Sequence, residues 1–356
     1  MRNQIVTPAA PQIKQYIVLW PLFFLICFGL GYQTLNRADP RGNLTDTRAY
    51  YGMVAGVENP EFSDYSQRVL VPYVAKPFYW IARGRVGTWD PVFLGLLVSN
   101  SLFVATAACL LVNIGYILLG DAALALLGTM LYLLNFAAGN YDLSGMVDSS
   151  QGLMILAVIR TLLTEKWRWL VLWGIVGAFT KETTAPLCLA FASGWWLASG
   201  IRNAFEWRKA FWVFAAAAAG FGALAVLMFY VSPYSPWSFA VSQRSQDAHR
   251  YFYLEGALRC VLNHEFIYVF AWLLPLGLRR VSSFPRPLAA ASLAGVLASV
   301  AMGAYSDALG NTVRPMFNVA GPLLSLSAAL SIYRLMGSTI TFRREIRISA
   351  KAVIRP

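Results

Sequence analysis

The sequence predicts an all-α polytopic membrane protein with about ten transmembrane helices. Of its 356 residues, 58% are hydrophobic and only 13% are charged, whereas a soluble domain carries roughly 25% charged residues. Aromatic residues make up 14% of the chain, which suits a protein with many membrane interfaces. This composition excludes a soluble enzyme, a disordered chain and a disulfide scaffold.

The apolar segments follow one another along the chain with short polar connections. The first, residues 16–32, is expected to be an uncleaved signal anchor, because it exceeds a signal-peptide core and no A-x-A site follows it. Two segments are separated only by the residues Lys181-Glu182-Thr183-Thr184, so each is short. The expected spans are residues 16–32, 91–118, 121–138, 146–163, 169–183, 184–200, 210–231, 264–278, 288–305 and 317–336.

The distribution of lysine and arginine predicts the orientation, because cytoplasmic loops are enriched in both. Residues 1–15 and the basic tail 337–356 are therefore expected inside, and the long loop 33–90 outside. The net charge of +12 fits basic cytoplasmic loops better than a nucleic-acid partner. We expect one integral-membrane domain over residues 1–356, with a helical bundle over 91–336.

This orientation predicts which cysteine variants react with a membrane-impermeant thiol reagent. Ser63→Cys lies in the outer loop and should be labelled in intact cells. Ser349→Cys lies in the basic tail and should be labelled only after the cells are permeabilised, because basic segments stay inside. Labelling of Ser349→Cys from outside intact cells would overturn the orientation.

Polar and ionisable residues gather at the expected outer ends of the spans. Placing such residues at membrane depth costs free energy, so their presence there indicates a functional site. In the first outer loop, residues 44–56 and 65–84 have the periodicity of amphipathic interfacial helices. The alanine run 215–219 predicts a close helix-packing face. Together the ionisable residues predict a polar cavity that opens outward: Asp142, Asp148, Lys181, Glu182, His264, Glu265, Asp307 and Arg314.

Several of these features occur together in one known family. The outer loop contains Asp46 in a D-x-x-x-Y-Y pattern with Tyr50 and Tyr51, and R-V-L-V-P over residues 68–72. A later helix pair carries a G-x-x-D start at Gly145 and a T-K-E-T turn at Thr180. With one span before a large outer loop, this order resembles the GT-C superfamily of integral-membrane glycosyltransferases, in the mannosyltransferase-like branch. The resemblance covers residues 15–190, and the W-W-D-x-G motif of oligosaccharyltransferases is absent.

The resemblance implies an active site fed by a polyprenyl-phosphate-linked sugar. It places the general base at Asp46, with Asp39 and Asp64 as nearby competitors and a helix N-cap as the plain structural alternative. Asp148 lies in an apolar run and is expected to orient the acceptor, pair with a cation or cap a helix. The leaving phosphate needs cations, for which the candidates are Lys181, Arg314 and Arg68. The remaining substrate-binding candidates are Tyr50, Tyr51, Glu182, Arg244 and Arg250.

The sequence gives no pattern for a resident cofactor. Its two histidines, His249 and His264, lack ligand spacing, and no two of its four cysteines form a CxxC pair. We therefore expect metal independence and no zinc site, although Asp46 with Asp148 or Glu182 leaves a divalent metal open.

These features favour a transferase that moves one sugar to a glycan, lipid or protein acceptor on the extracytoplasmic face, with inversion. The economical loops and lack of sorting signals favour a bacterial inner membrane. One alternative is a transporter or flippase for lipid-linked saccharides, which needs polar residues deep in several spans and an internal repeat. Another is a non-catalytic subunit of an envelope-glycan assembly complex, which should tolerate Asp46→Asn.

Overall fold

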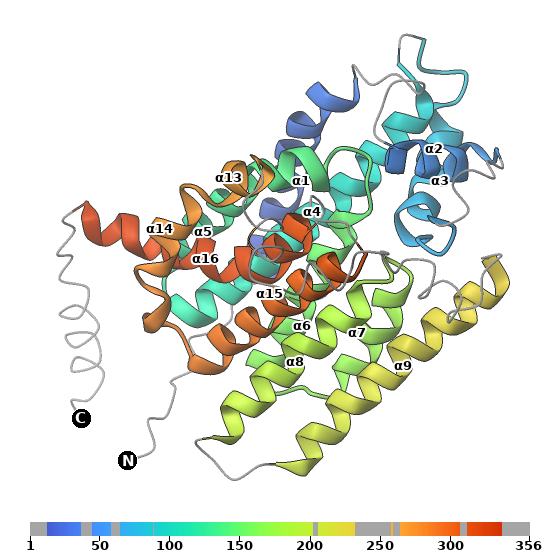
Figure 1. Ribbon diagram of the computed structural model, residues 1–356. Coiled ribbons are helices and arrows are strands. Elements are labelled where there is room, and N and C mark those ends of the chain that lie inside the picture. The colour runs from blue at the N-terminus through green and yellow to red at the C-terminus, as the bar shows by residue number, and fades with distance from the viewer. Residues whose placement is uncertain are drawn as a thin grey trace, which may run out of the picture.

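The computed structural model describes residues 13–36, 45–57, 65–87, 89–201, 206–231, 258, 264–306 and 312–336. Within these ranges the chain forms helices and no strand, which confirms the all-helical prediction (Figure 1). The helices are α1 (Ile13–Leu35), α2 (Thr45–Ala55), α3 (Leu70–Ala82), α4 (Pro91–Leu119), α5 (Ala122–Leu133), η2 (Ala138–Asp142), α6 (Asp148–Leu163), α7 (Trp169–Ala178), α8 (Thr184–Gly200), α9 (Trp207–Val231), α13 (His264–Phe270), α14 (Leu273–Leu278), η3 (Val281–Ser283), α15 (Arg286–Ser306) and α16 (Val313–Leu335).

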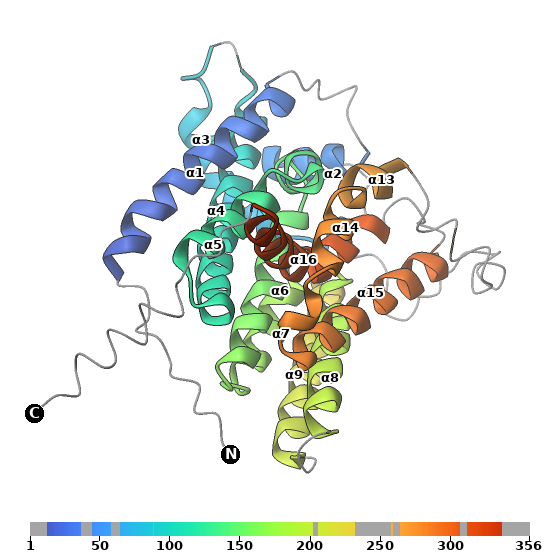
Figure 2. The ribbon, with the colours of Figure 1, turned by 90° about the vertical axis from the view of Figure 1, so that its left-hand side faces the viewer.

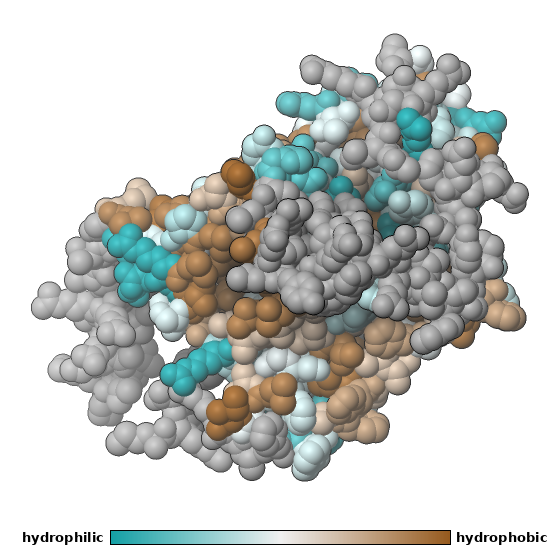
Figure 3. All heavy atoms as spheres, in the orientation of Figure 1, coloured by the Kyte–Doolittle hydropathy of each residue, from teal (hydrophilic) through white to brown (hydrophobic). Residues whose placement is uncertain are grey.

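Five of the described helices, α1, α4, α9, α15 and α16, are long and apolar enough to cross a membrane. The apolar windows of α1 and α9 are only 17% buried by the rest of the chain, whereas that of α16 is 78% buried. On α9 the side chains of Phe211, Phe214 and Phe229 are exposed. Large exposed apolar surfaces of this kind are rare on soluble monomers, and Figure 3 shows hydrophobic residues over much of one face. The helices are therefore compatible with an integral membrane protein.

The other expected spans form helices shorter than 18 residues, so the count of about ten is not confirmed; of these, 184–200 keeps its expected bounds as α8. The expected span 121–138 becomes α5, which has 12 residues. It ends at Leu133 because the chain turns at Asn135, whose Oδ1 accepts a hydrogen bond from the Ala137 backbone N–H at 3.0 Å. The expected span 264–278 is divided into the short helices α13 and α14.

Two long helices organise the bundle. Helix α4 packs against α1, α3, α5 and α6, while α16 packs against α5, α14 and α15. Helix α16 lies near the middle of the molecule in Figure 2, which explains why it is the most buried of the five long apolar helices. Helices α2 and α3, expected from residues 44–56 and 65–84, lie at one end of the bundle (Figures 1 and 2). This end carries the candidate site.

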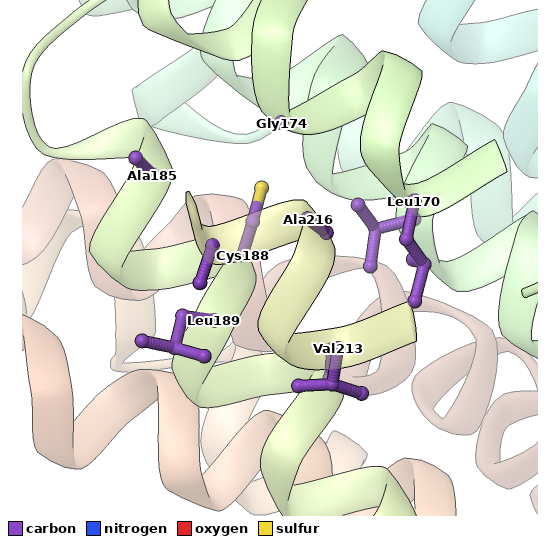
Figure 4. A pocket seen from close by; sticks show the side chains of 10 residues that line it. Leu170, Gly174, Ala185, Cys188, Leu189, Val213 and Ala216 are labelled. Carbon is purple, nitrogen blue, oxygen red and sulfur yellow. The ribbon is translucent and has the colours of Figure 1, made fainter. Parts of the chain in front are cut away.

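The alanine run of α9 forms the close-packing face that the sequence predicts. A Cβ atom at Gly174 of α7 would lie 2.5 Å from the carbonyl oxygen of Ala216, and one at Gly220 would lie 3.1 Å from the carbonyl oxygen of Gly174. Figure 4 shows Gly174 and Ala216 beside an apolar pocket whose volume is only about 10 Å³. The pocket is too small for a sugar, so this region serves packing.

This close approach predicts a strong effect of adding one methyl group. Gly174→Ala should force α7 and α9 apart and destabilise the protein by about 1–3 kcal/mol, the usual cost of overpacking. The matched control is Gly222→Ala on α9, where a Cβ atom would meet nothing within 4 Å. Thermal unfolding in detergent compares the two variants. Equal midpoints would contradict the close-packing interpretation.

Candidate functional site

Charged side chains from five separate segments meet at the α2 and α3 end of the bundle. The segments are the start of α2, the turn before α3, the start of α6, the turn between α7 and α8, and the start of α16. Three of the residues are acidic and three are basic, so their formal charges balance. We call this group the polar cluster, and its members are Asp46, Arg68, Asp148, Lys181, Glu182 and Arg314.

The Asp148 carboxylate is buried beside a lysine. Lys181 Nζ lies 3.0 Å from Asp148 Oδ1, and the two side chains are 11% and 2% exposed. A buried carboxylate is stable only when it is paired and hydrogen-bonded. Among the roles that the sequence leaves open for Asp148, the structure therefore shows pairing with a cation.

The Arg314 guanidinium lies between two carboxylates. Its Nη1 is 3.9 Å from both Asp46 Oδ2 and Asp148 Oδ2, which is longer than a direct charged hydrogen bond. The guanidinium carbon lies 4.6 Å from the centre of the Tyr141 ring. Its buried Nε has no hydrogen-bond partner among the described residues. Arg314 also occupies the first turn of α16, where the helix dipole favours an anion.

Arg68 ties the segment before α3 to the turn between α7 and α8. Its Nε donates to Glu182 Oε2 at 2.8 Å, its Nη1 donates to the Tyr50 hydroxyl at 2.9 Å, and its Nη2 donates to the second Glu182 oxygen. The Leu70 backbone N–H adds a 2.9 Å hydrogen bond to the Phe179 carbonyl oxygen. All three guanidinium nitrogens of Arg68 are thus engaged by the protein itself.

Asp46 is the most accessible acid of the polar cluster, since its side chain is 25% exposed. The hydroxyl of Tyr65 hydrogen-bonds to it. Burial, followed by the negative charge of Asp46, raises the pKa of Tyr65 to about 12. Tyr65 therefore stays protonated at neutral pH and can donate to the carboxylate. Tyr65 is not among the residues that the sequence predicts for the site, because no local pattern distinguishes it from the other tyrosines of the loop.

A second polar layer continues from the polar cluster. Asn318 donates to the side-chain oxygen of Gln151 at 3.1 Å, and Gln151 donates to the Thr183 hydroxyl at 2.9 Å. These residues are also absent from the predicted site. Their distance from the predicted site residues could have identified them. Gln151 follows Asp148 by three positions and Asn318 follows Arg314 by four, so each pair shares a helix face.

The remaining predicted site residues lie elsewhere or outside the described ranges. Tyr50 contacts Arg68 as described, but the Tyr51 hydroxyl donates to Asp90 Oδ2 at 2.7 Å, at the N-cap of α4. Tyr51 is therefore directed away from the polar cluster. Five further candidates lie outside the described residues: Asp39, Asp64, Arg244, Arg250 and Asp307.

The described residues contain no group of three or more His, Cys, Asp or Glu side chains placed to hold a metal ion. Metal independence stays a prediction.

The polar cluster contains an accessible carboxylate, Asp46, beside Arg314, whose Nε donor has no partner among the described residues. Such an arrangement can take a proton from a hydroxyl group and hold an anion next to it. No protein-family model and no curated protein matches the chain.

Proposed function

We propose that the protein is a GT-C-type glycosyltransferase that moves one sugar from a polyprenyl-phosphate-linked donor to an acceptor on the extracytoplasmic face of a bacterial inner membrane. One observation supports this proposal most. Asp46 Oδ2 lies 3.9 Å from Arg314 Nη1, which is equally close to the Asp148 carboxylate that is paired with Lys181. A base and two cations therefore lie within one polar cluster, as transfer from a lipid phosphate requires.

The proposed reaction is a single displacement. The Asp46 carboxylate takes the proton of the acceptor hydroxyl, and the hydroxyl oxygen attacks the anomeric carbon. The bond between that carbon and the phosphate oxygen breaks, and the phosphate leaves with the electron pair. Lys181 and Arg314 stabilise the negative charge that the phosphate gains. Attack from the face opposite the leaving group inverts the anomeric centre.

The other members of the polar cluster have supporting roles in this proposal. Tyr65 donates a hydrogen bond to Asp46 and orients the base. Arg68 and Glu182 hold the outer loop against the turn between α7 and α8, which keeps Asp46 near Arg314. We also propose that the chain has a GT-C-like arrangement with about ten spans, a number that is counted from the apolar segments of the sequence.

Deletion and complementation test the proposed function. Deleting the gene should leave a lipid-linked or surface glycan one sugar short, and mass spectrometry of the extracted glycans would identify the missing sugar. Wild-type protein should restore the full glycan, whereas the Asp46→Asn variant should not. Full rescue by Asp46→Asn would favour the non-catalytic subunit instead. Accumulation of the complete glycan on the cytoplasmic side would favour the flippase.

A further inference from the structure

A cavity of about 440 Å³ lies between the turn that joins α6 to α7 and the start of α9. It is separate from the polar cluster. Helix α6 begins at Asp148, within the polar cluster, and its 16 residues end at Leu163, next to this turn. At 1.5 Å per residue the two sites are about 24 Å apart. Helix α9 begins at the bottom of Figure 1, away from α2 and α3.

The charges around this cavity leave an excess of positive charge. Its two acids, Glu165 and Glu206, are both paired with Lys209, at 3.6 Å and 2.9 Å. Three more basic side chains line the cavity, and the ion pairs found here among the described residues involve only Lys209. These are Lys166, Arg168 and Arg208, and all three are exposed. The cavity is therefore equipped for an anion.

Two further features favour an anion at this position. Helices α7 and α9 both begin here, at Trp169 and Trp207, and the N-terminal end of a helix carries partial positive charge. Trp167 lines the cavity and is 6% exposed, and its indole N–H has no hydrogen-bond partner among the described residues. An unpaired buried donor is uncommon and indicates a missing acceptor.

The surroundings indicate that the anion belongs to a lipid. Trp207 is 75% exposed, and on the same helix Phe211 and Phe214 are 61% and 63% exposed, so the basic rim continues into apolar surface. Tryptophan is enriched where a membrane helix meets the headgroup layer. Basic pockets between helices on the cytoplasmic side are suited to anionic headgroups. A soluble phosphate would gain nothing from the adjoining apolar surface.

We propose that this cavity binds the phosphate of an anionic phospholipid headgroup in the cytoplasmic leaflet. Lys166, Arg168 and Arg208 contact the phosphate, and the acyl chains lie along the exposed face of α9. The volume of about 440 Å³ is within the range usual for small-molecule sites and leaves room for a glycerophosphate group. The proposal is independent of the proposed transferase activity.

Lipid binding to the purified full-length protein in neutral detergent tests this site. Native mass spectrometry would count bound phosphatidylglycerol, with phosphatidylcholine and inorganic phosphate as separate additions. We expect phosphatidylglycerol to bind more tightly than phosphatidylcholine by about tenfold or more, because only the former carries net charge. The triple variant Lys166→Gln, Arg168→Gln, Arg208→Gln should lose this preference. The single variants Arg168→Gln and Arg208→Gln, at exposed positions, should each lose part of it.

The matched control removes the same charge from another inner basic group. It is the triple variant Arg279→Gln, Arg280→Gln, Arg286→Gln, at the connection between α14 and α15, and it should keep the preference. Equal loss in both triple variants would overturn the proposal, because general surface charge would then explain the binding. Displacement of phosphatidylglycerol by equimolar inorganic phosphate would also overturn it, by showing a site for a free anion.

Discussion

Asp46→Asn is expected to lower the turnover number by about 10²–10⁴-fold while the protein stays folded and binds its donor. Asparagine keeps the size of the side chain and can still interact with Tyr65, but it cannot take a proton at neutral pH. A helix N-cap loses little in this change, because asparagine caps about as well as aspartate. The substitution therefore separates the base from a merely structural residue. Turnover of purified protein with a polyprenyl-phosphate sugar measures it.

Asp121→Asn is the matched control for this experiment. Asp121 caps α5 by accepting a 3.0 Å hydrogen bond from the Leu124 backbone N–H, and it lies outside the polar cluster. Its variant should keep wild-type turnover. If Asp46→Asn retains more than about a tenth of wild-type turnover, Asp46 is not the base. Asp148 would then be the next candidate, although its side chain is only 2% exposed and is paired with Lys181.

Arg314→Lys is expected to weaken donor binding by about 10- to 150-fold, which corresponds to the loss of one hydrogen bond to a charged group. Lysine keeps the positive charge but cannot hold phosphate oxygens with two parallel N–H donors. The buried guanidinium of Arg314 keeps a donor for this purpose at Nε, which has no partner among the described residues, while its Nη1 lies 3.1 Å from the Met146 sulfur. The dissociation constant of the donor, measured by its protection against thermal unfolding, gives the effect.

The same substitution at the other end of α16 provides the control. Arg334 lies in the last turn of that helix and is exposed, so Arg334→Lys should leave donor binding unchanged. Wild-type donor affinity in Arg314→Lys and in Arg314→Ala would refute the assignment and direct attention to Lys181. The stability of any Lys181 variant must be measured together with its donor affinity. Removing that lysine leaves Asp148 buried beside Arg314 alone and should lower the free energy of unfolding by about 3–5 kcal/mol.

Much of the secondary structure could be predicted from the sequence. Every expected apolar span contains a helix, and the two loop segments 44–56 and 65–84 form α2 and α3. Apolar runs and helical periodicity are local properties, so one sequence is sufficient to find them. Asp46 was a candidate through the resemblance of its D-x-x-x-Y-Y pattern, whereas Asp148, Lys181 and Arg314 were identified from their surroundings. Ionisable residues beside apolar runs are costly, and they stand out against their neighbours.

The lengths of the helices and the pairing of residues within the polar cluster could be determined only from the tertiary structure. Arg68 and Glu182 are 114 positions apart, and no local pattern pairs them or places Arg314 between Asp46 and Asp148. The adjacent residues Tyr50 and Tyr51 separate for the same reason, since one contacts Arg68 and the other contacts Asp90. The sequence by itself determined which residues are too costly to leave unpaired in apolar surroundings. Only the packing of α2, α6 and α16 decided their partners, because a buried charge pairs with whichever opposite charge the fold brings near.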